Sequence, residues 1–295
     1  MKNYFCLLFG TIIILSNQTF AAQSQTPKKT SPALTKPQPM PISSKPMNST
    51  PIAPGLSFGF DLNTRYTIQA EKQADGTRNE YLTYEFIPAF KTQDFRIRSI
   101  SDFYYFVKDQ STNEWDNTSF EATLNTPWNL GAYFDLKPDL ILALPIFRRT
   151  TDFNNYLGGR LTLILNSKNI GAPSLLFKYG VQFGKLSFKN EKTGADYNID
   201  TRLRQRVHLG YQFTDAISAL IYFHYDSNFL LDNSVRNAFY HETAISYAFI
   251  PDHVTLDLGV ANGGGVFAGE NQEIDNLKFY NEKSSEAFIQ LNLGI

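Results

Sequence analysis

The chain is almost free of cysteine. Its 295 residues include one, Cys6, which lies inside an apolar segment at the N-terminus. We expect that segment to be removed as a signal peptide, which would leave a mature chain without cysteine. This excludes disulfides, a thiol nucleophile and cysteine-ligated metal sites.

Long apolar runs and an excess of one charge are also missing. Hydrophobic residues make up 42% of the chain and the mean hydropathy is -0.27. No stretch supports an ordinary helical membrane protein, because each span would need about 20 apolar residues. Lysine and arginine together number 27, against 28 aspartates and glutamates. This balance gives no whole-protein signal for nucleic acid, and we expect no nucleic-acid partner.

The N-terminal segment has the three parts of a secretory signal peptide. Lys2 supplies the positive charge, Tyr4–Leu15 forms the apolar core and Ser16–Ala22 is the polar exit. Small residues at the two positions that a signal peptidase reads favour cleavage after Ala21, so we assign residues 1–21 to the signal peptide. An uncleaved anchor is the alternative, although this core is short for a membrane span.

Residues 22–54 form a second compositional region, which is rich in Pro, Ser, Thr and Lys and has no acidic residue. Such a segment cannot bury enough apolar surface to offset its ordering entropy, so we expect a disordered, semi-extended periplasmic linker. Its lysines could touch peptidoglycan or anionic headgroups, or the segment could be a solvated spacer. The sequence leaves both open.

The rest of the chain alternates apolar and polar residues, most clearly in residues 199–213, IDTRLRQRVHLGYQF. Alternate residues of a β-strand point to opposite faces, so this segment is apolar on one side and cationic on the other. At roughly 3.3 Å per residue it reaches about 50 Å, enough for a tilted strand to cross a bilayer. If the apolar face meets lipid, the arginines need water, and the strand must belong to a closed barrel with a wet interior.

The same period continues from Gly55 onward and predicts twelve strands. We place them at residues 56–69, 82–90, 95–107, 120–136, 140–147, 157–165, 174–188, 199–213, 217–225, 239–249, 254–260 and 287–295. The 25 Phe and 16 Tyr suit the interfacial aromatic girdles of a membrane barrel. The predicted fold class is all-β, a single transmembrane antiparallel up-and-down β-barrel of about 12 strands over residues 55–295.

The predicted connections alternate between short and long. The short ones are Lys91–Asp94, Lys137–Asp139, Ser167–Pro173, Thr214–Ala216 and Ile250–His253. The others run about eight to twenty residues, and outer-membrane barrels have short periplasmic turns and longer external loops. We therefore expect a location in the outer membrane of a Gram-negative bacterium, with the N- and C-termini in the periplasm.

Two of the predicted strands carry further signals. Strand 140–147 is apolar on both faces, so something other than water should cover part of its inner side. Strand 287–295 ends the chain with apolar residues that share the parity of Ile295. This resembles the C-terminal signature that outer-membrane barrels present to their insertion machinery, with Ile in place of the preferred Phe or Tyr. The implied partners are the barrel-insertion machinery during biogenesis, outer-membrane lipid and lipopolysaccharide.

Parity also assigns the charged residues that should line the lumen. The predicted pore-lining residues are the basic or imidazole side chains Arg65, Arg96, Arg98, Arg160, Lys178, Arg202, Arg204, Arg206 and His208, and the acidic side chains Glu85, Asp102, Asp226, Glu242 and Asp257. Bases concentrate on strands six to eight and acids on strands nine to twelve. These arcs should face each other across the lumen and create a transverse field, an arrangement similar to the constriction of general porins.

The strand count and the arginine-lined wall resemble small twelve-stranded porins for acidic sugars. The resemblance implies passive diffusion of small hydrophilic solutes, and the ladder of Arg202, Arg204 and Arg206 favours anionic ones. The charge total does not decide ion selectivity, because acids slightly outnumber bases inside. Twelve strands fall between barrels filled by side chains and barrels with a water channel, so an open narrow channel and an occluded barrel are both possible.

A barrel enzyme is the competing class. The run FHYDSN, residues 223–228, resembles the His-x-Ser-Asn segment of outer-membrane phospholipases, which are also twelve-stranded, and Asn237 could orient the imidazole. However, His224 and Ser227 are three residues apart and point to opposite faces of a regular strand. We therefore expect no enzyme and no catalytic residue, and interpret His224 as a lumen residue beside Asp226.

A non-conducting structural or adhesive barrel is the third class, although its loops are short for a large receptor surface. The loop acids Glu270, Glu273 and Asp275 could bind a divalent cation, but solvated loop charge is the simpler interpretation, so we expect no metal site. Gly263–Gly265 is not followed by a predicted helix whose N-terminus could bind phosphate. We expect no cofactor.

Overall fold

The computed structural model describes residues 50–53, 55–72, 78–107, 114–115, 118–144, 153–188, 192–193, 196–265 and 285–294. The chain divides into two compact units, Met1–Leu34 and Thr35–Ile295, and every described residue belongs to the second. The predicted signal peptide, most of the linker, Phe147, Ile295 and the three loop acids lie outside the described residues. Within the described ranges, no helix is long and apolar enough to span a membrane.

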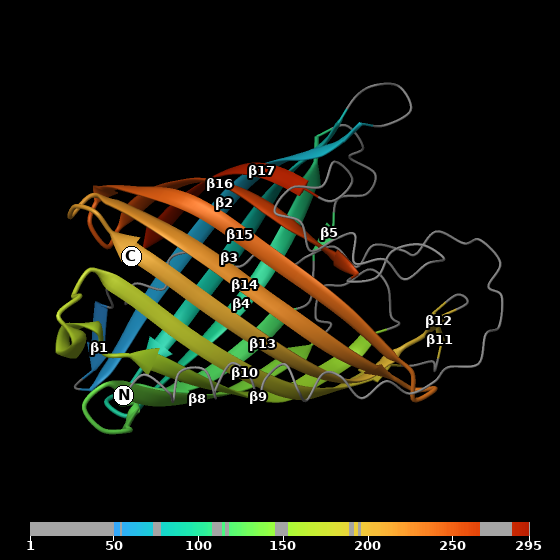
Figure 1. Cartoon of the computed structure of the whole chain (residues 1–295), viewed down its shortest axis with the longest axis horizontal. Coiled ribbons are helices and arrows are strands. Elements are labelled where there is room, and N and C mark those ends of the chain that lie inside the picture. The colour runs from blue at the N-terminus through green and yellow to red at the C-terminus, as the bar shows by residue number, and fades with distance from the viewer. Residues whose placement is uncertain are drawn as a thin grey trace. The chain divides into compact units, whose positions relative to one another are not determined.

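Long antiparallel strands form the wall of a barrel (Figure 1). They are β2 (Leu56–Lys72), β3 (Arg78–Lys91), β4 (Phe95–Phe106), β6 (Thr118–Leu124), β8 (Phe134–Leu144), β9 (Phe153–Leu165), β10 (Leu175–Phe188), β13 (Ile199–Gln212), β14 (Ile217–Leu230), β15 (Val235–Ile250), β16 (Val254–Gly265) and β17 (Ser285–Gly294). Each pairs with the next in chain order, and β17 pairs with β2 to close the cylinder. The predicted fold, a twelve-stranded up-and-down barrel, is confirmed.

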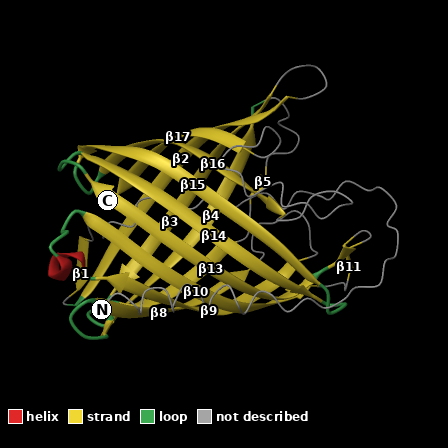
Figure 2. Ribbon diagram, in the orientation of Figure 1, coloured by secondary structure: helices red, strands yellow, loops and turns green. Residues whose placement is uncertain are grey.

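Several short elements accompany these long strands (Figure 2). They are β1 (Thr50–Ala53), β5 (Glu114–Trp115), β7 (Trp128–Asn129), a 3-10 helix (Ser167–Ile170), and β11 (Lys192–Thr193) with β12 (Asp196–Tyr197). Strand β1 pairs with the first residues of β2, so the last part of the predicted linker continues the sheet. β11 and β12 pair only with each other among the described strands.

The outer face of the barrel is apolar, as the alternation predicts. Phe183, Ile245 and Leu140 expose 60%, 59% and 57% of their surface. Residues on the opposite parity of the same strands, such as Gln182, Ala244 and Asp139, are at least 92% buried, with exposures of 7%, 2% and 8%. Lipid is the environment that stabilises such an apolar outer surface, because a closed barrel satisfies every backbone polar group internally.

An arginine on this outer face should destabilise the folded barrel in a bilayer. Ile245 lies well inside β15, opposite Leu258 of β16, whose exposed fraction is 51%. We expect Ile245→Arg to cost about 2–4 kcal/mol, the range for a cation near the bilayer midplane. The measurement is urea-dependent folding into lipid vesicles. The matched control is Leu231→Arg, in the connection after β14, where the cost should be about 0–1 kcal/mol. Equal costs at both positions would argue against a lipid-facing belt at Ile245.

One predicted turn is wrong. Lys137–Asp139 was expected to separate two strands, yet all three residues lie inside β8, and the chain reverses earlier, between β6 and β8. The reversal contains the β7–β8 pairing Trp128↔Leu136 and Gly131, whose φ of 94° is in the left-handed region. Pro138 fits in β8 because the β6 ladder stops at Thr123↔Asp139, so its missing N–H faces no partner in β6.

This correction changes strands four and five of the prediction. The long run 120–136 is divided among β6, β7 and the start of β8. The inner side of β8 is not apolar throughout, because Lys137 and Asp139 share the parity of Ile141. Farther along, Ile141 is 5% exposed and packs with Tyr156 and Leu186, so its inner face is covered, as expected.

The connections at the two ends of the barrel differ less in length than predicted. β14 and β15 extend toward each other, and only residues 231–234 separate them, where a long loop was expected. In contrast, residues 125–133 and 166–174 form longer connections at the opposite end of the barrel. Phe239 also differs from the prediction, because it has the outward parity of Ile245 but is only 2% exposed.

Candidate pore lining

The charged residues predicted to line the lumen lie on the inner parity of their strands. Contacts between strands that are not neighbours show this directly for Arg65, Glu242 and Arg160. Arg65 on β2 binds Glu242 on β15, although β17 and β16 lie between these strands in the wall. Arg160 on β9 likewise reaches Glu121 on β6, past β8. Such contacts can form only across the interior of a closed barrel.

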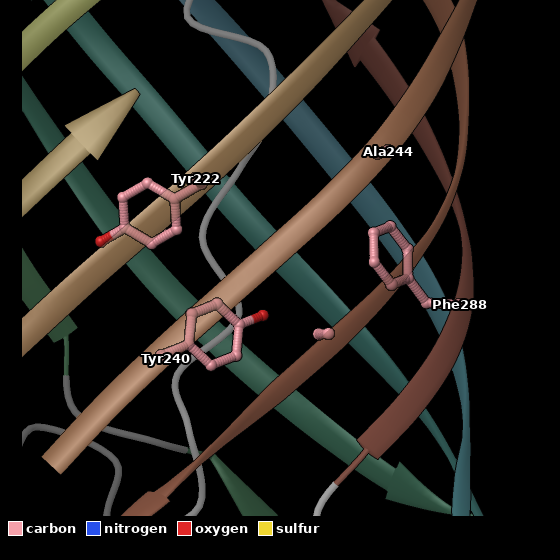
Figure 3. Packing of buried hydrophobic residues seen from close by; sticks show 5 residues of the cluster. Tyr222, Tyr240, Ala244 and Phe288 are labelled. Atoms are coloured by element: carbon pink, nitrogen blue, oxygen red, sulfur yellow. The ribbon is translucent and has the colours of Figure 1, made fainter. Parts of the chain in front are cut away.

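The first cluster fills the side of the lumen formed by β14 to β17 and β2. Arg65 Nη1 lies 2.7 Å from Glu242 Oε2, and the exposed fractions of the two side chains are 3% and 2%. Tyr240 Oη donates to the same carboxylate oxygen at 2.6 Å. The Arg65 guanidinium carbon lies 3.5 Å from the ring centroid of Phe288. Figure 3 shows Tyr240 and Phe288 projecting from β15 and β17, with Tyr222 of β14 beside them.

Neutral donors bind other carboxylates of the interior. Tyr81 Oη lies 3.0 Å from both oxygens of Glu286. Asn292 donates to Asp257 at 2.7 Å, and Asn63 donates to Glu85 at 2.5 Å. Asp102 is 2% exposed and stands directly opposite Glu85 in the β3–β4 ladder. Each of these acids is at least 92% buried, with Glu286 the most exposed at 8%.

A second network joins β4, β6, β8 and β9. Arg98 donates to Glu121 Oε2 through Nε at 3.0 Å and Nη2 at 2.7 Å. Arg160 Nη2 lies 3.2 Å from the same oxygen, and its Nε donates to Asp139 at 2.6 Å. Thr123 donates to the other oxygen of Asp139 at 2.6 Å. The arginine side chains remain more exposed, at 25% and 13%, than the side chains of Glu121 at 9% and Asp139 at 4%.

The arginine ladder of β13 forms the third network. Arg204 binds both oxygens of Asp226 on β14, with two bonds of 2.6 Å. Arg202 donates to Asn228 at 2.8 Å and lies 3.8 Å from Asp226. Again the carboxylate is the less exposed partner, because Asp226 is 6% exposed, whereas Arg202 and Arg204 are 24% and 13% exposed.

Arg206 has a different environment from its neighbours on the ladder. Its Nη2 donates to Gln182 of β10, which in turn donates to Tyr156 Oη at 2.7 Å. The side chain lies over Gly180, where an added Cβ would stand 2.9 Å from Arg206 Cγ. A glycine at this position therefore lets the aliphatic part of the Arg206 side chain lie against the wall. Arg206 Nε has no hydrogen-bond partner among the described residues.

The remaining bases complete one side of the lumen. Arg96 and Lys178 are partly exposed on the inner parity, and His208 lies opposite Lys178 with its ring centroid 4.6 Å from that of Tyr222. Lys137 belongs to the same group, and it interacts electrostatically with Lys178. We use the term basic wall for six partly exposed residues on β4, β8, β9, β10 and β13: Arg96, Arg98, Lys137, Arg160, Lys178 and Arg202.

Two acids of the predicted acidic arc are paired locally with arginines. Asp226 is neutralised by Arg204 on the adjacent strand, and Glu242 by Arg65. The two acids therefore do not face the basic wall as free charges. The two sides of the lumen differ in the exposure of their bases. Along the basic wall, the arginines are partly exposed and their carboxylate partners are buried, whereas Arg65 and Glu242 on the other side are both buried.

Sequence reasoning missed some members of these networks. Lys137 and Asp139 were assigned to a turn, so their inward parity was not considered. Gln182 shares the inward parity of Lys178, as the alternation predicts, whereas Tyr156 lies one residue before the predicted strand 157–165, and its parity opposite to Leu157 is a signal that could have identified it. Nothing in the local sequence predicts that Tyr156 binds Gln182 or that Arg206 lies over Gly180.

The hydrolase arrangement is not formed in β14. This strand pairs without a register shift from Ile217 to Phe229 against β15, so His224 and Ser227 occupy opposite faces. His224 instead faces inward, with Nδ1 2.9 Å from Tyr222 Oη and Nε2 4.0 Å from Asp226. Within the part of the chain that the structure describes, no group of three or more His, Cys, Asp or Glu is placed to hold a metal ion.

The sequence matches no protein-family model and no curated protein. The fold, however, matches solved structures. The NanC porin is 11% identical over 79% of this chain and 97% of its own, with a TM-score of 0.53. An outer membrane channel from Pseudomonas putida F1 is 10% identical over 86% of this chain and 100% of its own, with a TM-score of 0.51. The chain has the fold of small porin-like barrels. At such low identity the similarity concerns this porin-like fold alone.

Proposed function

We propose that the protein is a passive pore of the outer membrane for small hydrophilic solutes, with a preference for anions. One observation carries this proposal. In the ion pairs along the basic wall, the base is more exposed than the acid: Arg98 is 25% exposed against 9% for Glu121, and Arg202 is 24% exposed against 6% for Asp226.

The consequence for a solute is electrostatic. A hydrated ion moving along this wall meets guanidinium and ammonium groups first, and the carboxylates lie behind them. Rings of basic side chains favour anions in pores, and the low-dielectric wall strengthens that preference. The formal charge balance of the whole chain, 27 bases against 28 acids, would not produce a preference by itself.

The names of the structural neighbours, a porin and an outer membrane channel, support the same location and class of activity. The apolar outer face supports contact with outer-membrane lipid. We further propose that lipopolysaccharide and the barrel-insertion machinery are partners of the chain, that both termini are periplasmic, and that residues 1–21 and 22–54 are the signal peptide and the linker.

The test is the reversal potential of the refolded mature chain in a planar bilayer under a KCl gradient. We expect discrete conductance steps and a reversal potential displaced toward the equilibrium potential of chloride. A displacement toward that of potassium would contradict the anion preference. Silence from a barrel that is folded, as judged by its mobility in unheated gels, would contradict the pore and favour a non-conducting structural barrel, for which the packed cluster around Arg65 is the supporting feature.

A further inference from the structure

The Arg65–Glu242 ion pair joins two strands that are not neighbours in the wall, and it does so through the interior of the barrel. We call this link a chord. Strands β2 and β15 are separated in the wall by β17 and β16, and neighbouring strands lie about 4.8 Å apart. Arg65 and Glu242 therefore bridge three strand spacings with their side chains alone. Their contact is short, at 2.7 Å, and both are nearly inaccessible. A chord of this kind separates one segment of the lumen from the rest.

The segment behind the chord is packed with side chains. Phe288 lies under the Arg65 guanidinium, 3.5 Å from its central carbon. Its ring also rests on Gly259, because an added Cβ there would stand 2.4 Å from Phe288 Cζ. Ala244, labelled in Figure 3, and Ala261 are 2% and 1% exposed and belong to the same cluster. Small residues on β15 and β16 thus leave the space that the large ring of β17 fills.

The Glu242 end of the chord is held in place. Tyr240 donates to Glu242 and Tyr222 packs beside Tyr240, with ring centroids 6.1 Å apart. Rotamers that are locked by packing and hydrogen bonds make a rigid element rather than two mobile side chains. We call Arg65, Glu242, Tyr240 and Phe288 together the strut.

We infer that the strut sets the size limit of the pore and confines solutes to the side of the lumen lined by the basic wall. This inference rests on the proposed function. It assigns the size limit to the strut and the charge preference to the basic wall. Arg65 and Glu242 cancel each other's charge, so the strut occupies space without adding net charge, whereas the basic wall has an excess of bases.

Two variants of the strut test this separation. Arg65→Ala combined with Glu242→Ala removes the chord without leaving a buried unpaired charge. Phe288→Ala keeps the ion pair but removes the ring that fills the space behind it. This variant still tests the inference if the double variant does not fold. The matched control is Phe183→Ala, which makes the same deletion on the outer face, where Phe183 is 60% exposed.

Single-channel conductance, exclusion of polyethylene glycols of graded size, and the reversal potential are measured for each folded variant. We expect conductance to rise about 1.5- to 2-fold for a wider lumen. Larger polymers should enter, the reversal potential should stay at the wild-type value, and Phe183→Ala should match wild type in all three.

The outcomes separate this inference from the proposed function. A conducting wild type with unchanged conductance and polymer exclusion in both strut variants would overturn the size limit and leave the pore intact. A silent wild type with conducting strut variants would overturn the passive pore and support the strut as the element that closes it. A shift in reversal potential without a change in polymer exclusion would also overturn the inference, because it would give the strut a role in charge preference.

Discussion

Replacing Lys137 and Lys178 together with glutamine is expected to lower the chloride-to-potassium permeability ratio about tenfold. A unit charge about 12 Å from an ion in water stabilises chloride by about 0.35 kcal/mol and destabilises potassium by the same amount, so each lysine changes the ratio by a factor of about three. Both side chains lie on the inner parity and are partly exposed, and the charges near Lys178 include Lys137, Arg160 and Arg98. The measurement is the reversal potential under a KCl gradient.

The control for this prediction is Lys185→Gln. Lys185 is on β10 like Lys178, but it has the outward parity, is 71% exposed and lies 3.1 Å from Asp200. Loss of a positive charge outside the lumen should leave the permeability ratio close to that of wild type. An unchanged ratio in the double variant would remove the basic wall from the solute path.

Replacing Glu121 with glutamine is expected to lower the free energy of unfolding by about 3 kcal/mol. Glu121 accepts hydrogen bonds from Arg98 and Arg160, and the amide would leave Arg98 without its charge partner in this network. Loss of one partner of a buried ion pair costs roughly 3–5 kcal/mol, and the low end applies because Arg98 is 25% exposed. The measurement is urea-dependent unfolding in lipid vesicles, followed by tryptophan fluorescence.

Glu286→Gln is the matched control for the charge effect. Its hydrogen-bond donors are the phenol of Tyr81 and the amide of Gln69, so its replacement should cost about 1 kcal/mol, the value for neutral hydrogen bonds. An equal loss of unfolding free energy for Glu121→Gln and Glu286→Gln would mean that burial of these carboxylates, and not pairing with arginine, explains their contribution to stability. The Glu121 variant should also increase anion preference, because it removes one of the carboxylates behind the basic wall.

The sequence by itself determined the class of fold and the face of each strand. Alternation with a period of two is a local property, since successive side chains of a strand must point to opposite faces. It predicted twelve strands and placed residues such as Arg98, Arg204 and Glu242 on the polar face, and closure followed because lipid admits no open sheet edge. These conclusions required no knowledge of which strands pair in which register.

Tertiary structure decided which inner residues meet. Alternation does not predict that Arg65 reaches Glu242 past two strands, because contacts across the lumen depend on register and on the size of the residues between them. Lys137 and Asp139 were misassigned for a related reason, since Pro138 normally indicates a turn but here lies where the neighbouring ladder has ended. The same distinction applies to exposure: parity gives Arg202 and Asp226 the same face, and only the packed barrel makes the arginine accessible and the carboxylate buried.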